Sequence, residues 1–179
     1  MRSRLTARLT RVALAAAVST AALTGIGAAT ATAASGGAAA HDEVGQFCGT
    51  NDLTFTLDEE TQAGGYYLIT AKAKPGITCY LQGIYPTASF GSTPETRVGP
   101  AEQSTSEEIK LSGDTVAYSG ISPKSVGGNE GTDSDRLTLA ITNFEVEPVT
   151  FTLPGTVSVN EPIATNWHAD AADAVPFPN

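Results

Sequence analysis

Apolar and polar residues alternate in short runs along most of the chain, and Gly and Pro separate the runs. In LTFTL (53–57), the apolar residues fall on one side of an extended chain and the two threonines on the other, as in a half-buried strand. Beyond the N-terminal segment, no long window carries the i, i+3, i+4, i+7 stripe of an amphipathic helix. The pattern therefore predicts an all-β fold of about eight short strands, in an antiparallel sandwich or barrel.

The predicted strand segments are rich in β-branched and aromatic residues at alternate positions. They cover residues 53–57, 66–73, 77–81, 88–90, 109–111, 116–121, 137–142, 149–153, 157–159 and 163–167. The segments between them that are rich in turn-forming or acidic residues are predicted to be loops, above all 58–65, 91–107 and 122–134.

The stretch that indicates strands most clearly is YYLITAKAKPGITCYLQGIYP, residues 66–86. It predicts two strands joined by a turn at Pro75-Gly76, because proline cannot donate a ladder hydrogen bond and glycine tolerates positive φ. Gly83 and Pro86 then indicate a bulge or a switch of sheet. Two strands alone leave their apolar faces uncovered, so the other strands must cover them.

Residues 1–33 have the pattern of a secretory signal peptide. Four arginines precede an uncharged run (12–29) of mostly small and apolar residues, and Ala-Thr-Ala follows it. We expect cleavage after Ala33, with Ala40 as a second option, and hence a secreted, extracellular protein with a disordered leader at 34–46. A retained transmembrane anchor is disfavoured because the run is only weakly apolar, so no membrane span is expected after processing.

The chain is acidic, with 19 Asp and Glu residues against 10 Lys and Arg residues. Because four of the ten basic residues are the arginines of the predicted signal, the processed chain would keep six and carry a net charge of −13. Such a chain repels nucleic acid and anionic lipid surfaces and stays soluble. Nucleic-acid binding is therefore disfavoured, whereas a cationic partner stays open.

The chain has two cysteines, Cys48 and Cys79. In an exported protein they predict a disulfide. The loop that it would close, about 31 residues long, corresponds to a stabilisation of roughly 3–4 kcal/mol. A metal site is disfavoured because no histidine stands near them in sequence, and a reactive thiol is disfavoured because the compartment would oxidise it.

Three elements together resemble the DUF4232 family, a group of secreted actinobacterial domains of unknown function. They are Cys48 followed by NDLTFTL, then residues 66–86, then KLSGDTVAYSGI. The family's Thr-Cys-x-Leu-x-Gly-x-Pro and Leu-x-Gly-x-x-Ala elements correspond here to Thr78, Cys79, Leu81, Gly83 and Pro86, and to Leu111, Gly113 and Ala117. One extra residue between Gly and Pro leaves the strand register near Gly83 open.

The resemblance covers residues 48–167 and implies an immunoglobulin-like antiparallel β-sandwich. It brings no known activity and no catalytic residues. We place the sandwich domain at 47–170 and expect a flexible tail at 171–179.

Residues typical of catalysis or metal binding are scarce. No Gly-x-Ser-x-Gly or Ser-x-x-Lys motif is present. The histidines are His41 in the leader and His168, which is expected as an exposed tail residue beside Trp167. Asp133 and Asp135 follow a glycine-rich stretch and would suit calcium, but the complete calcium-loop pattern is absent. We therefore expect no catalytic residue, no cofactor and no metal ligand.

The larger aromatic residues leave two interpretations open. They can form a ligand-binding patch, or they can pack in the core, which is the simpler interpretation. The residues concerned are Tyr66, Tyr80, Tyr85 and Trp167. LPGTV (153–157) resembles a sortase signal, but no apolar span follows it. We interpret it as a strand that ends in a Pro-Gly turn.

The sequence thus predicts a secreted, non-enzymatic β-sandwich that acts as a binding or interaction module outside the cell or in its envelope. An inhibitor of an extracellular enzyme, with the loop 122–134 as bait, is the first alternative. A hydrolase with an unrecognised site is the second, and it is disfavoured because neither histidine is expected to be buried.

Overall fold

The computed structural model describes residues 45–141 and 147–177. The predicted signal peptide, both cleavage positions, His41, most of the leader and Thr142 lie outside these residues. Within them the chain forms ten strands and three short 3₁₀ helices but no α-helix. No helix in this part of the chain is long and apolar enough to cross a membrane. The all-β prediction is confirmed.

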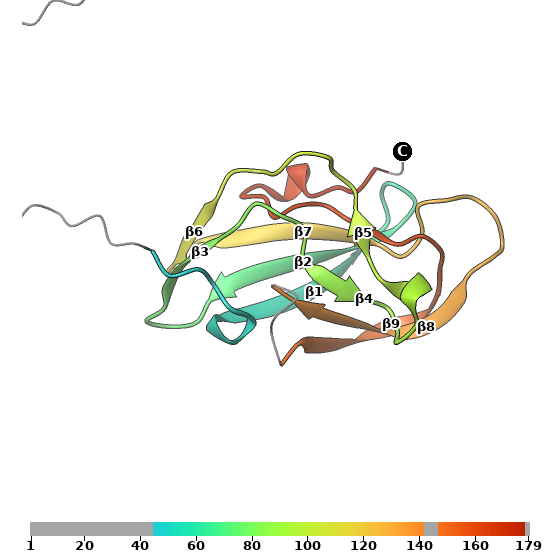
Figure 1. Ribbon diagram of the computed structural model, residues 1–179, viewed down its shortest axis with the longest axis horizontal. Coiled ribbons are helices and arrows are strands. Elements are labelled where there is room, and N and C mark those ends of the chain that lie inside the picture. Colours follow the sequence, from blue (N-terminus) through green and yellow to red (C-terminus); the bar gives the residue numbers. More distant parts are fainter. Residues whose placement is uncertain (1–44, 142–146, 178–179) are drawn as a thin grey trace, which may run out of the picture. The chain divides into compact units, whose positions relative to one another are not determined.

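The strands form three sheets (Figure 1). The largest has the order β1-β2-β7-β10-β5 and contains β1 (Leu53–Glu60), β2 (Tyr66–Ala73), β7 (Val116–Ser122), β10 (Ile163–Ala164) and β5 (Gly99–Pro100). The second pairs β3 (Thr78–Leu81) with β6 (Ile109–Ser112). The third has the order β4-β8-β9 and contains β4 (Thr87–Ser89), β8 (Thr132–Ala140) and β9 (Val149–Val159). The 3₁₀ helices are η1 (Thr50–Asp52), η2 (Pro94–Thr96) and η3 (Ala171–Asp173).

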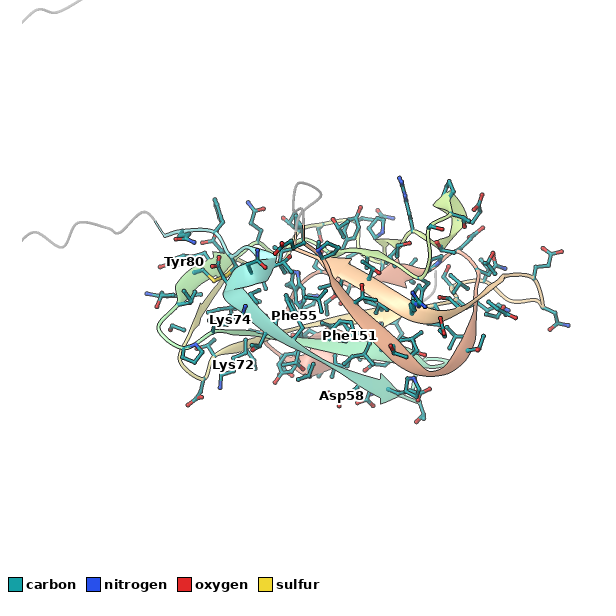
Figure 2. All side chains as sticks on the ribbon, turned by 90° about the horizontal axis from the view of Figure 1, so that it is seen from below. Phe55, Asp58, Lys72, Lys74, Tyr80 and Phe151 are labelled. Atoms are coloured by element: carbon teal, nitrogen blue, oxygen red, sulfur yellow. A yellow bond between two sulfur atoms is a disulfide. The ribbon has the colours of Figure 1, made fainter. Side chains whose placement is uncertain are left out.

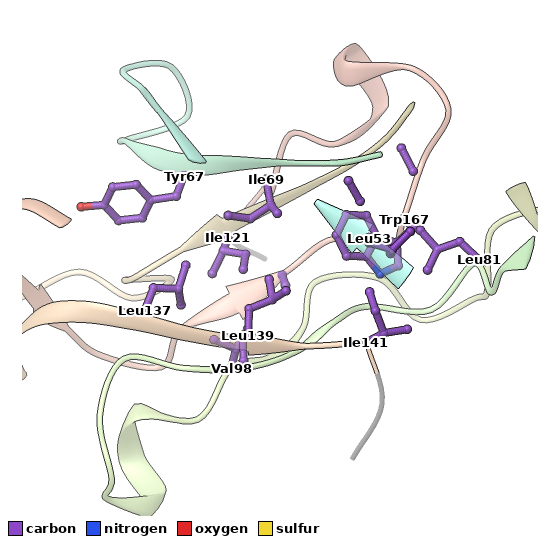
Figure 3. Packing of buried hydrophobic residues seen from close by; sticks show 14 of the residues in the cluster. Leu53, Tyr67, Ile69, Leu81, Val98, Ile121, Leu137, Leu139, Ile141 and Trp167 are labelled. Carbon is purple, nitrogen blue, oxygen red and sulfur yellow. The ribbon is translucent and has the colours of Figure 1, made fainter. Parts of the chain in front are cut away.

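Much of the core lies between the five-stranded sheet and the β4-β8-β9 sheet, and the β3-β6 sheet contributes further buried residues to it. Half-buried Phe55 of β1 and Phe151 of β9, on the edge strands of these sheets, pack against it (Figure 2). Ile69 of β2 and Ile121 of β7 face Leu139 of β8, and all three side chains are 0% exposed (Figure 3). Alternation along each strand gives each sheet an apolar inner face, and covering two such faces removes the most apolar area from water. The fold is therefore an antiparallel β-sandwich, as predicted.

The turn at Pro75-Gly76 carries the chain from one sheet to another. Gly76 has a φ of 82°, which fits the turn predicted there. β2 pairs with β1 and β7, whereas β3 pairs with β6. The chain changes sheet again between β3 and β4, in the stretch where Gly83 and Pro86 predicted such a switch.

Two strands are longer than their apolar alternation predicted. β1 continues through Asp58 to Glu60, in the predicted loop 58–65, because these residues stay in register with the start of β2. β8 begins at Thr132, inside the predicted loop 122–134, because its first residues pair with the end of β9. Their side chains are mostly exposed, so the apolar pattern could not show that the backbone pairing continues.

β9 passes through Pro154-Gly155 without a turn, so the strand end predicted there is wrong. Thr152 pairs with Arg136 and Val157 pairs with Ser134, and the register shifts between these two pairs. β9 lies at the edge of its sheet. At an edge, a missing proline N–H need not break the ladder, and a bulge absorbs the extra residues.

Residues 171–177 pack against the sandwich, whereas we expected a flexible tail. η3 begins with the Ala172 N–H donating to Asp170 Oδ1 at 2.9 Å, and Ala174 and Pro176 are both buried. The segment lies over Gly120 of β7, where an added Cβ would stand 2.0 Å from the Ala174 carbonyl oxygen. Glycine at this strand position leaves the room that the C-terminal segment fills.

Gly120→Ala is expected to destabilise the domain by about 1–3 kcal/mol, because the added methyl group forces the C-terminal segment to shift. Urea unfolding measures the loss. Gly127→Ala is the matched control, since nothing lies within 4 Å of its added Cβ. Equal unfolding midpoints for the two variants would show that the segment does not contribute to the fold.

Candidate functional site

A cluster of polar side chains forms where β5 and β10 end. We call it the Glu102 cluster, and it contains Glu102, Ser106, Asn166 and His168. β5 and β10 run parallel, with Gly99 opposite Ile163, so continuation of this register brings Glu102 level with Asn166. Sequence patterns did not indicate Glu102, Ser106 or Asn166. β5 (Gly99–Pro100) has no apolar alternation, and the alternation over 163–167 does not show which strand lies beside it.

Glu102 is the centre of this cluster. Its Oε2 accepts a hydrogen bond from the Asn166 side-chain amide at 2.8 Å, and its Oε1 lies 2.9 Å from His168 Nε2. Asn166 is 3% exposed, and its amide also donates to the Ser104 carbonyl at 2.6 Å. The carboxylate therefore holds the segment after β5 against the segment after β10.

His168 is not the exposed tail residue that the sequence suggested. Its backbone exchanges two hydrogen bonds of 2.8 Å with Tyr118 of β7, and its side chain is 18% exposed. Ser106 Oγ lies 3.5 Å from Nδ1 and 3.4 Å from Nε2, so it is aligned with neither nitrogen. In a catalytic triad the hydroxyl and the carboxylate bond to different ring nitrogens. The arrangement fits a link between loops better than an activated serine.

Glu102→Ala is expected to lower the free energy of unfolding by about 1–3 kcal/mol, because the buried Asn166 amide loses a hydrogen-bond acceptor. Urea unfolding followed by the fluorescence of Trp167, the neighbour of Asn166, measures this loss. Glu107→Ala removes the same charge from an exposed residue a few positions along the chain and serves as the control. An unchanged midpoint for Glu102→Ala would contradict the structural role of the carboxylate.

A groove of about 780 Å³ runs along β4 and β8. Ser89 of β4 lies opposite Arg97 on one side and Thr138 of β8 on the other, and residues opposite each other project from the same face. This face is the outer one, because the alternating residues Ala88 and Leu139 belong to the core. The volume is within the range of small-molecule sites.

The two ends of this β4–β8 groove differ in chemistry. Thr87 and Ala140 lie opposite each other beside the segment that enters β4, where Ile84 and Tyr85 line the groove. Ile84 is 38% exposed, an unusual degree of exposure for a large apolar side chain in this domain. Arg97 lines the groove opposite Ser89, two residues further along β4. One end is thus apolar and the other carries a cation.

Three groups with shifted pKa values, Asp114, Tyr66 and Tyr67, lie away from the groove and from the Glu102 cluster. The hydrogen bond from Lys72 at 2.7 Å, together with its charge, lowers the pKa of Asp114. Burial, and then the nearby carboxylates of β1, raise the pKa of Tyr66 and Tyr67. These groups are an exposed ion pair and two packed phenols, so the shifts mark structural positions.

Asp133 and Asp135, considered as calcium ligands from the sequence, are exposed residues of β8. Asp135 Oδ1 lies 3.5 Å from the Nε of Arg136. In the described ranges 45–141 and 147–177, no three His, Cys, Asp or Glu side chains come together in a way that could hold a metal ion.

The aromatic residues considered for a ligand patch do not gather in one place. Tyr66 is 3% exposed and Trp167 is 1% exposed, so core packing explains both. The ring of Tyr80 faces Lys110, whose Nζ lies 5.6 Å from the ring centroid. Of the four, Tyr85 lines the β4–β8 groove.

Cys48 and Cys79 form the predicted disulfide, which lies beside Tyr80 in Figure 2. The Cys48 N–H donates to the Tyr80 carbonyl, and the Tyr80 N–H donates to the Gln46 carbonyl, both at 2.9 Å. The disulfide therefore links the segment before β1 to β3, and both cysteines of the chain take part in it.

Residues 48–170 match a family model described as "Domain of unknown function (DUF4232)". The chain belongs to the DUF4232 family. No curated protein and no solved structure matches it. The disulfide, the β4–β8 groove and the Glu102 cluster all lie within the matched residues of the DUF4232 domain. The family description assigns no activity, so the function has to be argued from these features.

Proposed function

We propose that this DUF4232 protein is exported and acts as a non-catalytic binding module outside the cell or in its envelope, with the β4–β8 groove as its ligand site. The groove is the observation that carries the proposal. It is concave and large enough for a small molecule, and its lining combines mostly apolar residues with five polar or charged ones. Its floor is built on paired strands, which keep it in shape without a ligand.

Export is supported by two independent features. The disulfide is typical of oxidising compartments, and residues 1–33 have the charge and hydropathy pattern of a signal peptide. The family resemblance adds an immunoglobulin-like strand arrangement, which is common in extracellular binding domains.

A non-catalytic role is supported by the geometry of the Glu102 cluster. It brings a serine, a histidine and a carboxylate together, which is the composition of a hydrolase triad. However, Ser106 Oγ is no closer than 3.4 Å to either ring nitrogen of His168. The carboxylate is also engaged by the buried Asn166 amide, which suits a fixed structural link.

A second candidate function is inhibition of an extracellular enzyme by the predicted bait loop. Ser125 Oγ donates to the Glu161 carbonyl at 2.5 Å, and Lys124 forms a backbone bridge with Asn160, so the base of the loop is fastened. Val126 beyond it is 37% exposed. A fixed base below an exposed apolar residue suits insertion into an enzyme cleft. This role is tested by assaying secreted hydrolases in the presence of the parent domain or of Val126→Asp. It requires that the parent domain inhibits a hydrolase and that Val126→Asp does not.

The proposed function is tested with the neutral, environment-sensitive dye Nile red. We expect saturable binding to the disulfide-bonded domain, with a blue-shifted emission, because the groove shields the dye from water. Ile84→Asp should weaken this binding about tenfold or more. Val126→Asp is the matched control, since Val126 is 37% exposed and Ile84 is 38% exposed. Equal affinities in both variants, or no saturable binding to the parent, would contradict the groove as a ligand site.

A further inference from the structure

Arg97 differs from the other cations of the described chain. The chain has ten Lys and Arg residues, of which four belong to the predicted signal. The other five cationic side chains have contacts: Lys72 with Asp114, Lys74 with the Asn51 carbonyl, Lys110 with Tyr80, Lys124 with the Gly128 carbonyl and Arg136 with Asp135. Within residues 45–141 and 147–177, the Arg97 guanidinium has no such contact.

Glu95, the nearest carboxylate in sequence, forms no ion pair with Arg97 in the part of the chain that the structure describes. Arg97 is thus exposed and without an ion pair among the described residues of an acidic domain. Such a guanidinium is well suited to a carboxylate, which it binds through two parallel hydrogen bonds.

The position of Arg97 in the β4–β8 groove indicates in which direction a ligand would lie. Ser89 lies opposite Arg97, whereas Ile84 and Tyr85 line the groove where the chain enters β4. An extended chain covers about 13 Å between Tyr85 and Ser89. A molecule with an apolar chain of that length and an acid group at one end would match both ends of the groove.

We propose that the β4–β8 groove binds an amphipathic monocarboxylate, with its apolar chain against Ile84 and Tyr85 and its carboxylate paired with Arg97. This assignment rests on the proposed function and names the ligand class of the same site. The shared chemistry is an aliphatic chain that ends in one carboxylate.

Charge complementarity favours this ligand over other amphiphiles. A cationic amphiphile would place a like charge next to Arg97. A polyanion would meet one cation and then the repulsion of a domain in which acidic residues outnumber basic ones. A neutral alcohol of equal length would gain the same apolar contacts without the ion pair. A ligand with an apolar chain and a single negative charge at one end is the one that makes favourable contacts at both ends of the groove.

Competition against Nile red tests the proposal with three probes that carry the same chain, used below their micelle concentrations. Decanoate is expected to displace the dye at about tenfold lower concentration than decanol, and decyltrimethylammonium at higher concentration than either. Arg97→Gln should remove the advantage of decanoate over decanol, and Arg97→Lys should restore part of it. Arg136→Gln is the matched control, because it removes the same charge from a residue outside the groove lining.

The outcomes separate this proposal from the proposed function. If Nile red binds and depends on Ile84 but decanol matches decanoate, the groove is a ligand site and the carboxylate assignment is overturned. An equal loss of decanoate preference in Arg97→Gln and Arg136→Gln would also overturn it, because the effect would then come from net charge alone. Absence of saturable dye binding removes the groove function itself. Amide chemical shifts that move with decanoate at Ser89 and Arg97, and stay unchanged with decanol, would support the assignment directly.

Discussion

Leu139→Asp is expected to leave the domain unfolded under conditions in which the parent protein is folded. Leu139 lies on β8, is 0% exposed, and faces Ile69 and Ile121 of the opposite layer (Figure 3). Removing such a side chain costs about 2–5 kcal/mol, and burying an unpaired carboxylate adds several kcal/mol more. Because domains of this size have a net stability of roughly 5–15 kcal/mol, the sum is comparable with the whole stability.

Far-ultraviolet circular dichroism and thermal melting measure this effect. Thr152→Asp is the matched control, because it adds the same charge at an exposed position of β9, opposite Arg136. We expect this control to keep the parent midpoint within about 0.5 kcal/mol. A cooperative transition of Leu139→Asp at the parent midpoint would show that the two apolar faces do not form the stabilising core.

The local pattern of the chain was enough to predict the sandwich and its inner faces. Ile69 and Leu139 stand at alternating apolar positions, and each strand can bury only one such side. Gly76 and Gly83 stand where the chain turns or changes sheet, since proline and glycine limit or widen the backbone angles locally. These features depend only on residues that are close together in the chain, so they can be predicted from a single sequence.

The strand boundaries show where local pattern stops being informative. Asp58 continues β1 because β2 offers backbone partners, and an exposed carboxylate does not hinder that pairing. Pro154 is accepted within β9 because the strand is at an edge of its sheet. Whether a strand is central or at an edge depends on the whole topology. The alternation of apolar residues does not contain that information.

The candidate site depends even more on distant pairing. Glu102 and His168 are 66 residues apart and meet through the pairing of two strands of two residues each. Arg97 borders the groove because η2 folds the chain back, so that Arg97 lies opposite Ser89. A charged residue in a Gly- and Pro-rich loop gives no local sign of such a position. A search for cations that lack an acidic neighbour in sequence would not have found it either, because Glu95 stands two residues away.

Loss of the Cys48–Cys79 disulfide is expected to lower the free energy of unfolding by about 3–4 kcal/mol. The bond spans 31 residues, which include β1 and β2, and it restricts the unfolded chain over that length. In the native state it also holds residues 46–48 against β3, where Tyr80 exchanges backbone hydrogen bonds with them. Both cysteines are buried, at 4% and 0% exposure. Alanine at both positions removes only the two sulfur atoms, so the cavity that it leaves is small.

The double variant Cys48→Ala/Cys79→Ala is compared with the parent in urea unfolding, with and without reductant. Reductant should lower the midpoint of the parent to that of the double variant and leave the double variant unchanged. The parent is reduced in urea and then refolded, because the buried sulfurs of the native state are shielded. If the reduced parent keeps its midpoint, loop closure does not stabilise this domain. The expected loss of about 3–4 kcal/mol comes from chain entropy alone. A loss of unfolding free energy well above about 4 kcal/mol would mean that the packing of residues 46–48 on β3 also depends on the disulfide.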